Sequence, residues 1–382
     1  MRYTWNNQED LRKREMIMYR GLAKLSIGQC RVCATAENLN KTFEGHNFYK
    51  SRADPQICSR VYSDEFSLTF TWTDNILGIS STVEGENLAK SQLGASYEIK
   101  DMKEAKFILG ICIDRDSITG DITLSQRSYC KCMLKCFNME SCSLKSTPLP
   151  PGLVLTAENC SSTPEKTNKI QDMPYQEALG LLMWLQVATW SDISHAITLL
   201  SHFAHNPEKS HWTAVKHVLA YIKGILYYEI TYKADSKLNP TGYVDSNFVG
   251  CKDIHCSTEE NIFIMAGGPV SWKSKRQETV ALSMVEAKYM GFSRVTTQAL
   301  WISKYLNEIR LPISKPIVIF ADNNRSISHS LNDKNHCRIK HIDMWHHFIK
   351  NHVKSGDVVF QYIPTSDNIT DLFTKPLSQD KI

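Results

Sequence analysis

Four acidic residues in the C-terminal part of the chain could act together as metal ligands. They are Asp245 within a short β-prone run, Glu286 in a helix-prone segment, Asp322 after an apolar run, and Asp371 near the C-terminus. Carboxylate oxygens are the ligands that Mg²⁺ prefers. Taken singly, each residue is explained as well by a turn or by a solvated helix. A shared site therefore depends on whether the surrounding elements bring the carboxylates together.

The elements expected after residue 240 alternate in type. The pattern predicts strands at 242–248, 261–265, 270–273, 316–320 and 358–363, and helices at 283–295, 298–309, 326–331, 341–353 and from 368 onward. Three antiparallel strands followed by alternating helices and strands indicate a mixed α/β (α+β) fold with a five-stranded sheet.

The earlier part of the chain has a different pattern. It predicts a helix or helix pair over 11–39, a hairpin of 57–63 with 66–72, a helix over 84–93, a hairpin of 107–113 with 121–124, and a helix over 126–137. Residues rich in Ser, Thr, Pro and Glu then indicate a linker over 143–173. Apolar residues return every three to four positions over 175–188, 193–203 and 211–224, which predicts a small helical subdomain at 174–239.

Length and charge set broad limits. With 382 residues, of which 42% are hydrophobic, the chain can form two or three globular domains. A formal net charge of +4 permits a phosphate-binding surface without arguing for one. Neither a secretion signal nor a run long enough to span a bilayer is apparent, so we expect an intracellular protein of the cytoplasm or nucleus with no membrane partner. The oligomeric state remains open.

Cysteine and histidine offer weaker metal signals. Twelve cysteines are too sparse for a disulfide scaffold. The pair Cys30 and Cys33 has zinc-knuckle spacing but no second pair nearby. One group of cysteines is predicted to pack in the core and not to bind a metal: Cys130, Cys132, Cys136 and Cys142. One group of histidines is predicted to be partly exposed on a helix, with zinc binding as the lesser alternative: His336, His341, His346 and His347.

Six motifs from residue 240 onward resemble the ribonuclease H domain of copia-type retrotransposon polyproteins. They are residues 242–245 (GYVD), 270–277 (VSWKSKRQ), 286–287 (EA), 321–323 (ADN), 340–343 (KHID) and 371–377 (DLFTKPL). Their occurrence in one order makes the resemblance specific. It implies a ribonuclease H-like sheet over 240–382.

The resemblance implies a role for each carboxylate. Asp245 would bridge two Mg²⁺ ions, Glu286 and Asp322 would each hold one, and Asp371 would complete the second site, with Asp367 as a competitor one helical turn away. Two such ions activate a water and stabilise the leaving oxygen when a phosphodiester is hydrolysed. The implied substrate is the RNA strand of an RNA/DNA hybrid.

The part of the chain before residue 240 looks like the reverse transcriptase of the same polyprotein, with residues 1–142 as a partial palm and thumb. The supporting stretches are 53–55 (ADP), 109–110 (LG), 124–126 (LSQ), 146–150 (STPLP), 182–185 (LMWL), 211–212 (HW) and 220–224 (AYIKG). Such polymerases carry two adjacent aspartates in a palm hairpin, whereas this chain has Asp74 followed by Asn75. The fingers and an upstream aspartate are also expected to be missing. We therefore predict no polymerase activity.

Several positions depart from the family pattern near the carboxylates. Related sequences usually have aspartate at Asn247, tryptophan near Phe248, a basic pair near His255, and a second glutamate at Lys288. Because Lys288 is two residues from Glu286, we expect it to point to another face of the helix and to leave the metal untouched. The chain resembles a truncated and drifting copy.

Two functional hypotheses follow. In the first, a truncated polyprotein fragment keeps a ribonuclease H domain that cleaves RNA/DNA hybrids with two Mg²⁺ ions. In the second, the fragment is catalytically inactive and at most binds nucleic acid through Lys and Arg side chains. Whether the chain is an enzyme is left open by the sequence.

Overall fold

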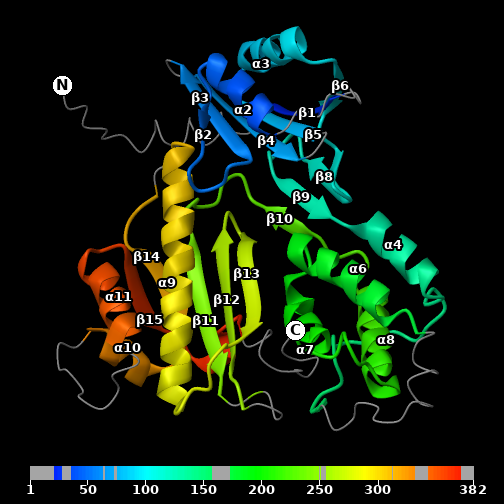
Figure 1. The fold of residues 1–382 in the computed structure, drawn as a ribbon, viewed down its shortest axis with the longest axis vertical. Helices are drawn as coiled ribbons and strands as arrows, with labels where there is room; N and C mark the ends of the chain where they lie inside the picture. Colours follow the sequence, from blue (N-terminus) through cyan, green and yellow to red (C-terminus); the bar gives the residue numbers. More distant parts are fainter. Residues whose placement is uncertain are drawn as a thin grey trace.

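The computed structural model describes residues 21–27, 36–62, 65–72, 75–156, 173–248, 250, 255–311, 313–331 and 343–370. These residues form a six-stranded sheet, a small four-stranded sheet, a group of helices and a five-stranded sheet. In Figure 1 the six-stranded sheet lies at the top, and the five-stranded sheet and the helical group lie side by side below it.

The strands are β1 (Gly21–Ile27), β2 (Tyr49–Lys50), β3 (Ile57–Tyr62), β4 (Glu65–Trp72), β5 (Asn75–Ser80), β6 (Ile99–Glu104), β7 (Phe107–Ile108), β8 (Ile111–Arg115), β9 (Ile122–Ser125), β10 (Ile230–Tyr232), β11 (Thr241–Asn247), β12 (Thr258–Met265), β13 (Gly268–Arg276), β14 (Ile317–Ala321) and β15 (Val358–Tyr362). The helices are α2 (Ala36–Gly45), α3 (Val83–Ser96), α4 (Arg127–Cys136), α6 (Tyr175–Ala188), α7 (Ser194–Ser201), α8 (Lys209–Gly224), α9 (Met284–Glu308), α10 (Asn324–Leu331) and α11 (Asp343–Lys354), with short 3₁₀ turns η2 (Ser191–Ile193) and η3 (Thr365–Asp367).

The five-stranded sheet has the order β13-β12-β11-β14-β15. The first three strands are antiparallel to one another, whereas β11, β14 and β15 run parallel. This arrangement confirms the mixed, ribonuclease H-like sheet expected from the sequence. It also places the carboxyl ends of β11 and β14 at the same edge, where an α/β fold commonly has its ligand site.

Helix α9 crosses this sheet as one continuous element of 25 residues. The prediction of two helices divided near residue 296 was wrong. Buried residues Phe292, Val295 and Ala299 continue one apolar stripe across the expected break, and packing of that stripe on the sheet outweighs the low helix propensity of the β-branched residues. At the N-terminus, Ser283 Oγ accepts a hydrogen bond from Glu286 N (3.2 Å) and caps the helix.

A glycine lets α9 approach β11 closely. A Cβ added at Gly291 would lie 2.5 Å from Ser246 Oγ and 3.5 Å from Val244 Cγ2. The first of these separations is shorter than real Cβ contacts allow, so the approach requires glycine at this position. The close contact fixes the first turns of α9 above the end of β11.

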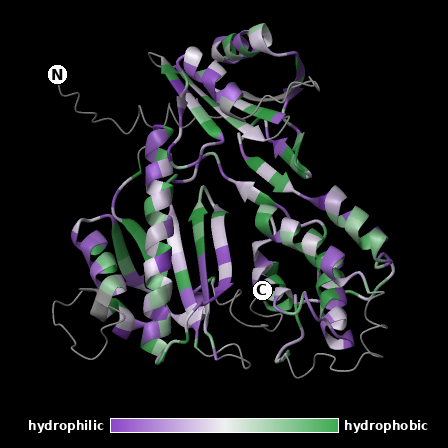
Figure 2. Cartoon of the chain, viewed as in Figure 1, coloured by the Kyte–Doolittle hydropathy of each residue, from purple (hydrophilic) through white to green (hydrophobic). Residues whose placement is uncertain are grey.

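The helical group packs around its own apolar core and against the second face of the five-stranded sheet. Helices α6, α7 and α8 supply most of that core, and Figure 2 shows α6 and α7 as largely hydrophobic. Trp272 Nε1 of β13 donates to Gln186 O (2.9 Å), and Thr198 Oγ1 of α7 donates to Ser274 O (2.9 Å). Leu149, within the expected linker, is buried in this core.

The six-stranded sheet occupies the segment expected to be a partial palm. Its strand order is β2-β3-β4-β5-β1-β6, and the predicted hairpin of β3 with β4 is present. The helix prediction for 11–39 was wrong over Gly21–Ile27, which form β1 between β5 and β6. Cross-strand pairing on both sides of this short mixed segment decides its conformation.

The end of α9 joins this sheet to the five-stranded one. Glu308 Oε2 accepts hydrogen bonds from Ser51 Oγ (2.6 Å), Arg52 N (2.9 Å) and Ala53 N (3.2 Å). Leu68 of β4 belongs to the same apolar core as Leu306 of α9. Among the described helices, none is both long and apolar enough to cross a membrane.

Candidate active site

Asp245 and Asp322 converge at one edge of the five-stranded sheet. β11 and β14 are parallel neighbours, with Val244 paired to Ala321, so the two aspartates follow at the same level. Asp245 is 8% exposed and the Asp322 side chain 11% exposed. The geometry therefore brings together two of the four carboxylates that were singled out in the sequence.

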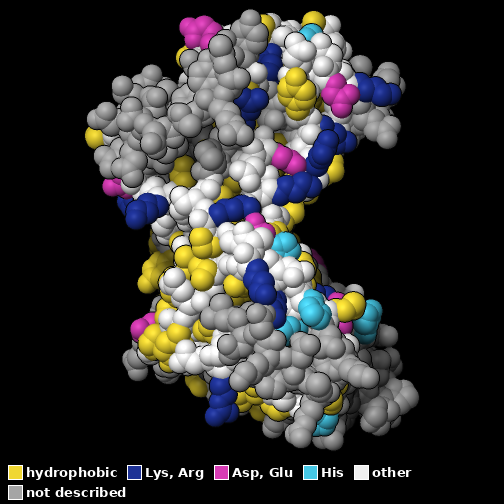
Figure 3. All heavy atoms as spheres, turned by 90° about the vertical axis from the view of Figure 1, so that its left-hand side faces the viewer, with side chains coloured by type: hydrophobic (Ala, Val, Ile, Leu, Met, Phe, Trp, Pro, Cys, Tyr) yellow, Lys and Arg dark blue, Asp and Glu magenta, His cyan; other side chains and the backbone are white. Residues whose placement is uncertain are grey.

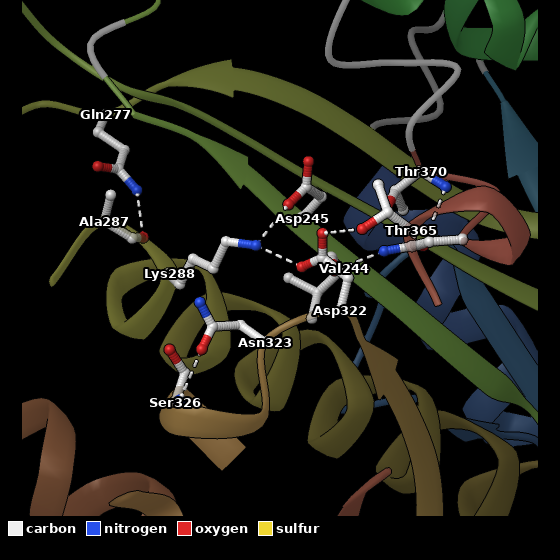
Figure 4. A network of polar contacts seen from close by, with 11 residues as sticks. Val244, Asp245, Gln277, Ala287, Lys288, Asp322, Asn323, Ser326, Thr365 and Thr370 are labelled. Carbon is white, nitrogen blue, oxygen red and sulfur yellow. Dashed lines mark hydrogen bonds and ion pairs between the residues drawn. The ribbon is translucent and has the colours of Figure 1, made fainter. Parts of the chain in front are cut away.

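The residue of α9 that reaches these aspartates is Lys288. Its Nζ lies 3.3 Å from Asp245 Oδ1 and forms a hydrogen-bonded ion pair with Asp322 Oδ1. Figure 4 shows the lysine side chain running from α9 to the space between the two carboxylates. The expectation that Lys288 points away from the site was wrong.

Glu286 has a different contact. Its Oε2 accepts a hydrogen bond from Leu282 N (2.7 Å), just before α9 begins, while its own backbone N–H donates to the Ser283 cap. Residues two apart on an α-helix are separated by about 200° around the axis. Lys288 and Glu286 thus lie on different sides of α9.

The signal that could have identified position 288 is the phase of the apolar stripe on α9. Phe292, Val295, Ala299 and Ile302 face the sheet at alternating intervals of four and three residues. Extending that phase toward the N-terminus leads to 288.

The segment after β15 closes the other side of the site. Thr365 Oγ1 donates to Asp322 Oδ2 (3.1 Å), and Asn368 Nδ2 donates to Val244 O (3.2 Å). Thr370 donates from N and Oγ1 to Asn368 Oδ1 (3.2 and 2.7 Å) and so orients that amide. Asp367 is exposed, with Ser366 Oγ donating to its Oδ1 (3.0 Å). Asp371 lies outside the described residues.

Charge at the site is partly balanced from within the chain. Burial raises the pKa of Asp245, and nearby Asp322 raises it further, whereas the Lys288 ammonium lowers it. Two carboxylates and one ammonium sum to a net charge of −1. The lysine thereby lessens the repulsion between two buried anions at close range.

The described side chains at this edge of the sheet do not fit a pair of Mg²⁺ ions. Two magnesium ions need a cage of oxygen ligands, as the chemistry of Mg²⁺ dictates. Here the space between Asp245 and Asp322 contains a cationic nitrogen group that cannot coordinate while protonated and that repels a metal ion. Across the described part of the chain, no cluster of three His, Cys, Asp or Glu side chains is arranged to hold a metal.

Two side-chain amides, the buried Gln277 and the partly buried Asn323, position the helices around the site. Gln277 Nε2 donates to Ala287 O (2.8 Å) and fixes the backbone next to Lys288. Asn323 Oδ1 accepts from Ser326 N (3.0 Å) and caps α10 directly after Asp322 (Figure 4). The lysine and the second aspartate are thus each anchored by a neighbouring hydrogen bond.

Among the residues that the structure describes, the other sequence candidates form no second metal site. Asn75 begins β5 opposite Trp72 in the β4–β5 hairpin, and Asp74 lies outside the described residues. Cys130 is buried in the helical core, as expected for packing, but Cys132 and Cys136 are exposed on α4. His346 stacks on Tyr289, with ring centroids 5.8 Å apart, next to His347 on α11. Cys30, Cys33, His336 and His341 lie outside the described residues.

Comparisons with known proteins give a consistent set of relatives. The chain is 32% identical over 339 residues to the retrovirus-related Pol polyprotein from transposon TNT 1-94 of Nicotiana tabacum, covering 88% of this chain and 25% of that protein. It is 37% identical over 134 residues to secreted RxLR effector protein 161 of Plasmopara viticola, covering 35% of this chain and 94% of that protein. The chain spans about a quarter of the length of the Pol polyproteins that it matches.

One solved structure among those that match is a ribonuclease H1 isolated from compost. It is 13% identical, with a TM-score of 0.28, over 35% of this chain and 92% of that chain. No family model matches the chain.

Proposed function

We propose that this chain, which belongs to the Pol polyproteins of copia-type retrotransposons, is a nucleic-acid-binding segment whose ribonuclease H-like domain does not hydrolyse RNA/DNA hybrids. The observation that carries the proposal is the Lys288 ammonium between Asp245 and Asp322. A two-metal hydrolase needs that space for cations bridged by carboxylates. A lysine there removes the metal sites and with them the activated water.

Polymerase activity is also proposed to be absent. The palm hairpin of β4 with β5 has Asn75 where the resemblance leads one to expect the second aspartate. An amide cannot supply the anionic ligand that neutralises a magnesium ion. A primed template incubated with Mg²⁺ and nucleotides should therefore show no extension.

Binding of nucleic acid is proposed to rest on charge and not on metal bridges. Lys and Arg side chains are scattered mostly over the upper and middle parts of the face shown in Figure 3, with a few Asp and Glu side chains among them, and His side chains gather on its lower part. Scattered cations of this kind contact phosphates without reading sequence. We expect weak binding of an RNA/DNA hybrid that falls steeply as salt rises.

Hydrolysis is the competing function, because Asp245 and Asp322 still meet at the carboxyl ends of parallel strands. One experiment separates the two. A labelled RNA/DNA hybrid is incubated with the purified chain in Mg²⁺, binding is followed by fluorescence anisotropy, and the RNA strand is resolved on a gel. The proposal predicts salt-sensitive binding with an intact RNA strand. A shortened RNA strand would support hydrolysis, and the absence of binding at low salt would refute the binding role.

A further inference from the structure

We infer that the Lys288 ammonium serves as the resident cation of the Asp245–Asp322 pair, so that this sheet edge is complete without a divalent ion and becomes a divalent-cation site when residue 288 is made acidic. The inference rests on the proposed function, since it concerns the same site. The inference is tested without nucleic acid, so it can fail while the proposed function holds, and the reverse.

The first step is that the carboxylate pair needs a cation. Both aspartates are largely buried. Asp245 is part of β11 and Asp322 directly follows β14, and the Val244–Ala321 pair holds these two strands in register. Buried like charges at close range are tolerated when an opposite charge or hydrogen bonds accompany them. Thr365 Oγ1 supplies one hydrogen bond to Asp322, but a hydroxyl brings no charge.

The second step is that Lys288 fits this role geometrically. It is itself 9% exposed, and its Nζ contacts one oxygen of each aspartate. Its place is fixed from two sides, because Gln277 holds the carbonyl of Ala287 and Gly291 lets the next turn of α9 rest on β11. The ammonium is therefore held at the carboxylates by the packing of the helix and not by side-chain flexibility alone.

The third step concerns what one substitution would do. In Lys288→Glu, a carboxylate would start from the same backbone position, on the side of α9 that faces the aspartates. Three acidic side chains, from β11, from α9 and from the residue directly after β14, would then meet at one edge. Clustered carboxylates on rigid elements are the ligands of Mg²⁺ and Mn²⁺. The variant should lose stability in a chelator and regain it with either ion.

The experiment measures thermal unfolding of the full chain in EDTA and in increasing MgCl₂ or MnCl₂. The wild type should unfold at the same temperature in both conditions. Lys288→Glu should unfold earlier in EDTA and be stabilised by the ions, and a cation at ten times its Kd raises the folded-to-unfolded ratio about elevenfold. Lys216→Glu, at an exposed position on α8, is the control with the same charge change and should gain nothing from the ions.

Two results would overturn the inference. One is stabilisation of the wild type by Mg²⁺ or Mn²⁺ equal to that of Lys288→Glu, which would mean that the lysine does not exclude the ions. The other is a Lys288→Glu chain that folds and shows no cation-dependent shift. If Lys288→Glu does not fold in EDTA, refolding in the presence of MnCl₂ decides the question, and failure to recover there also counts against the inference. Lys288→Met tests the cation role alone: a chain as stable as the wild type in EDTA would contradict it.

Discussion

Lys288 Nζ lies 3.3 Å from Asp245 Oδ1 and also pairs with Asp322, in a fold that otherwise has the strand order of a ribonuclease H domain. The sheet places two acidic residues at its edge, and the helix that crosses the sheet places a lysine between them. The sheet that would hold a catalytic metal pair is therefore present, but a positively charged side chain lies between its two aspartates.

The energetic coupling of this pair can be measured by a double-mutant cycle. Lys288→Met should lower the free energy of unfolding by about 3 kcal/mol, because it leaves two buried carboxylates without a cation. Asp245→Asn in the same background should recover part of that loss, since it removes one of the two charges. Urea unfolding of the four chains gives the coupling energy, and additive effects would contradict a direct interaction.

Gly291 is predicted to be required for the approach of α9 to β11. Gly291→Ala places a methyl group 2.5 Å from Ser246 Oγ and should destabilise the protein by about 1–3 kcal/mol through overpacking. The matched control is Gly180→Ala on α6, where an added Cβ meets nothing within 4 Å and should stabilise by up to about 1 kcal/mol. Equal effects of the two substitutions in urea unfolding would refute the close-packing explanation.

The Glu308 contact should make stability depend on pH. Burial raises the pKa of Glu308, but hydrogen bonds from Ser51 Oγ and from the Ala53 and Arg52 amides hold this pKa below its usual range. Because the pKa is lower in the folded state, the ionised carboxylate stabilises the protein at pH values above the unfolded-state pKa of about 4.3. This stabilisation is lost as the pH falls through the folded-state pKa.

Glu308→Gln should therefore be less stable than the wild type by about 1 kcal/mol at about pH 6, and the difference should shrink toward about pH 3. The exposed Glu140→Gln is the control. Urea midpoints across this range give the result, and a difference that grows as the pH falls would have the wrong sign for the proposed contact.

The five-stranded sheet is predicted to need the helical group for full stability. Trp272 bonds to Gln186, and Ser274 accepts a hydrogen bond from Thr198, so a fragment of residues 240–382 would lose these partners and expose the buried Glu260. A fragment of residues 173–382 keeps them. Thermal unfolding should show a lower midpoint for the shorter fragment, and equal midpoints would show that the sheet is independent of the helices.

Much of the site could be predicted from sequence because its strands are local features. Asp245 and Asp322 follow short apolar runs whose type and order indicate β11 and β14, and the glycine-flanked first run fits the central strand. The motif order then indicated the sheet that joins them.

The identity of the third side chain could not be obtained in the same way. Glu286 and Lys288 point to different sides of α9, and the residues of α9 that pack on the sheet decide which of the two faces the aspartates. The predicted break near residue 296 obscured the apolar stripe that continues from Phe292 to Leu306. Without that stripe, the motif alone favoured Glu286.

The most direct test of the account is cleavage of a labelled RNA/DNA hybrid by the wild-type chain in Mg²⁺ or Mn²⁺, with Asp245→Asn as the matched control. The account predicts that the RNA strand stays intact with both proteins, because Lys288 holds the place between the aspartates. Cleavage by the wild type that disappears in Asp245→Asn would contradict it.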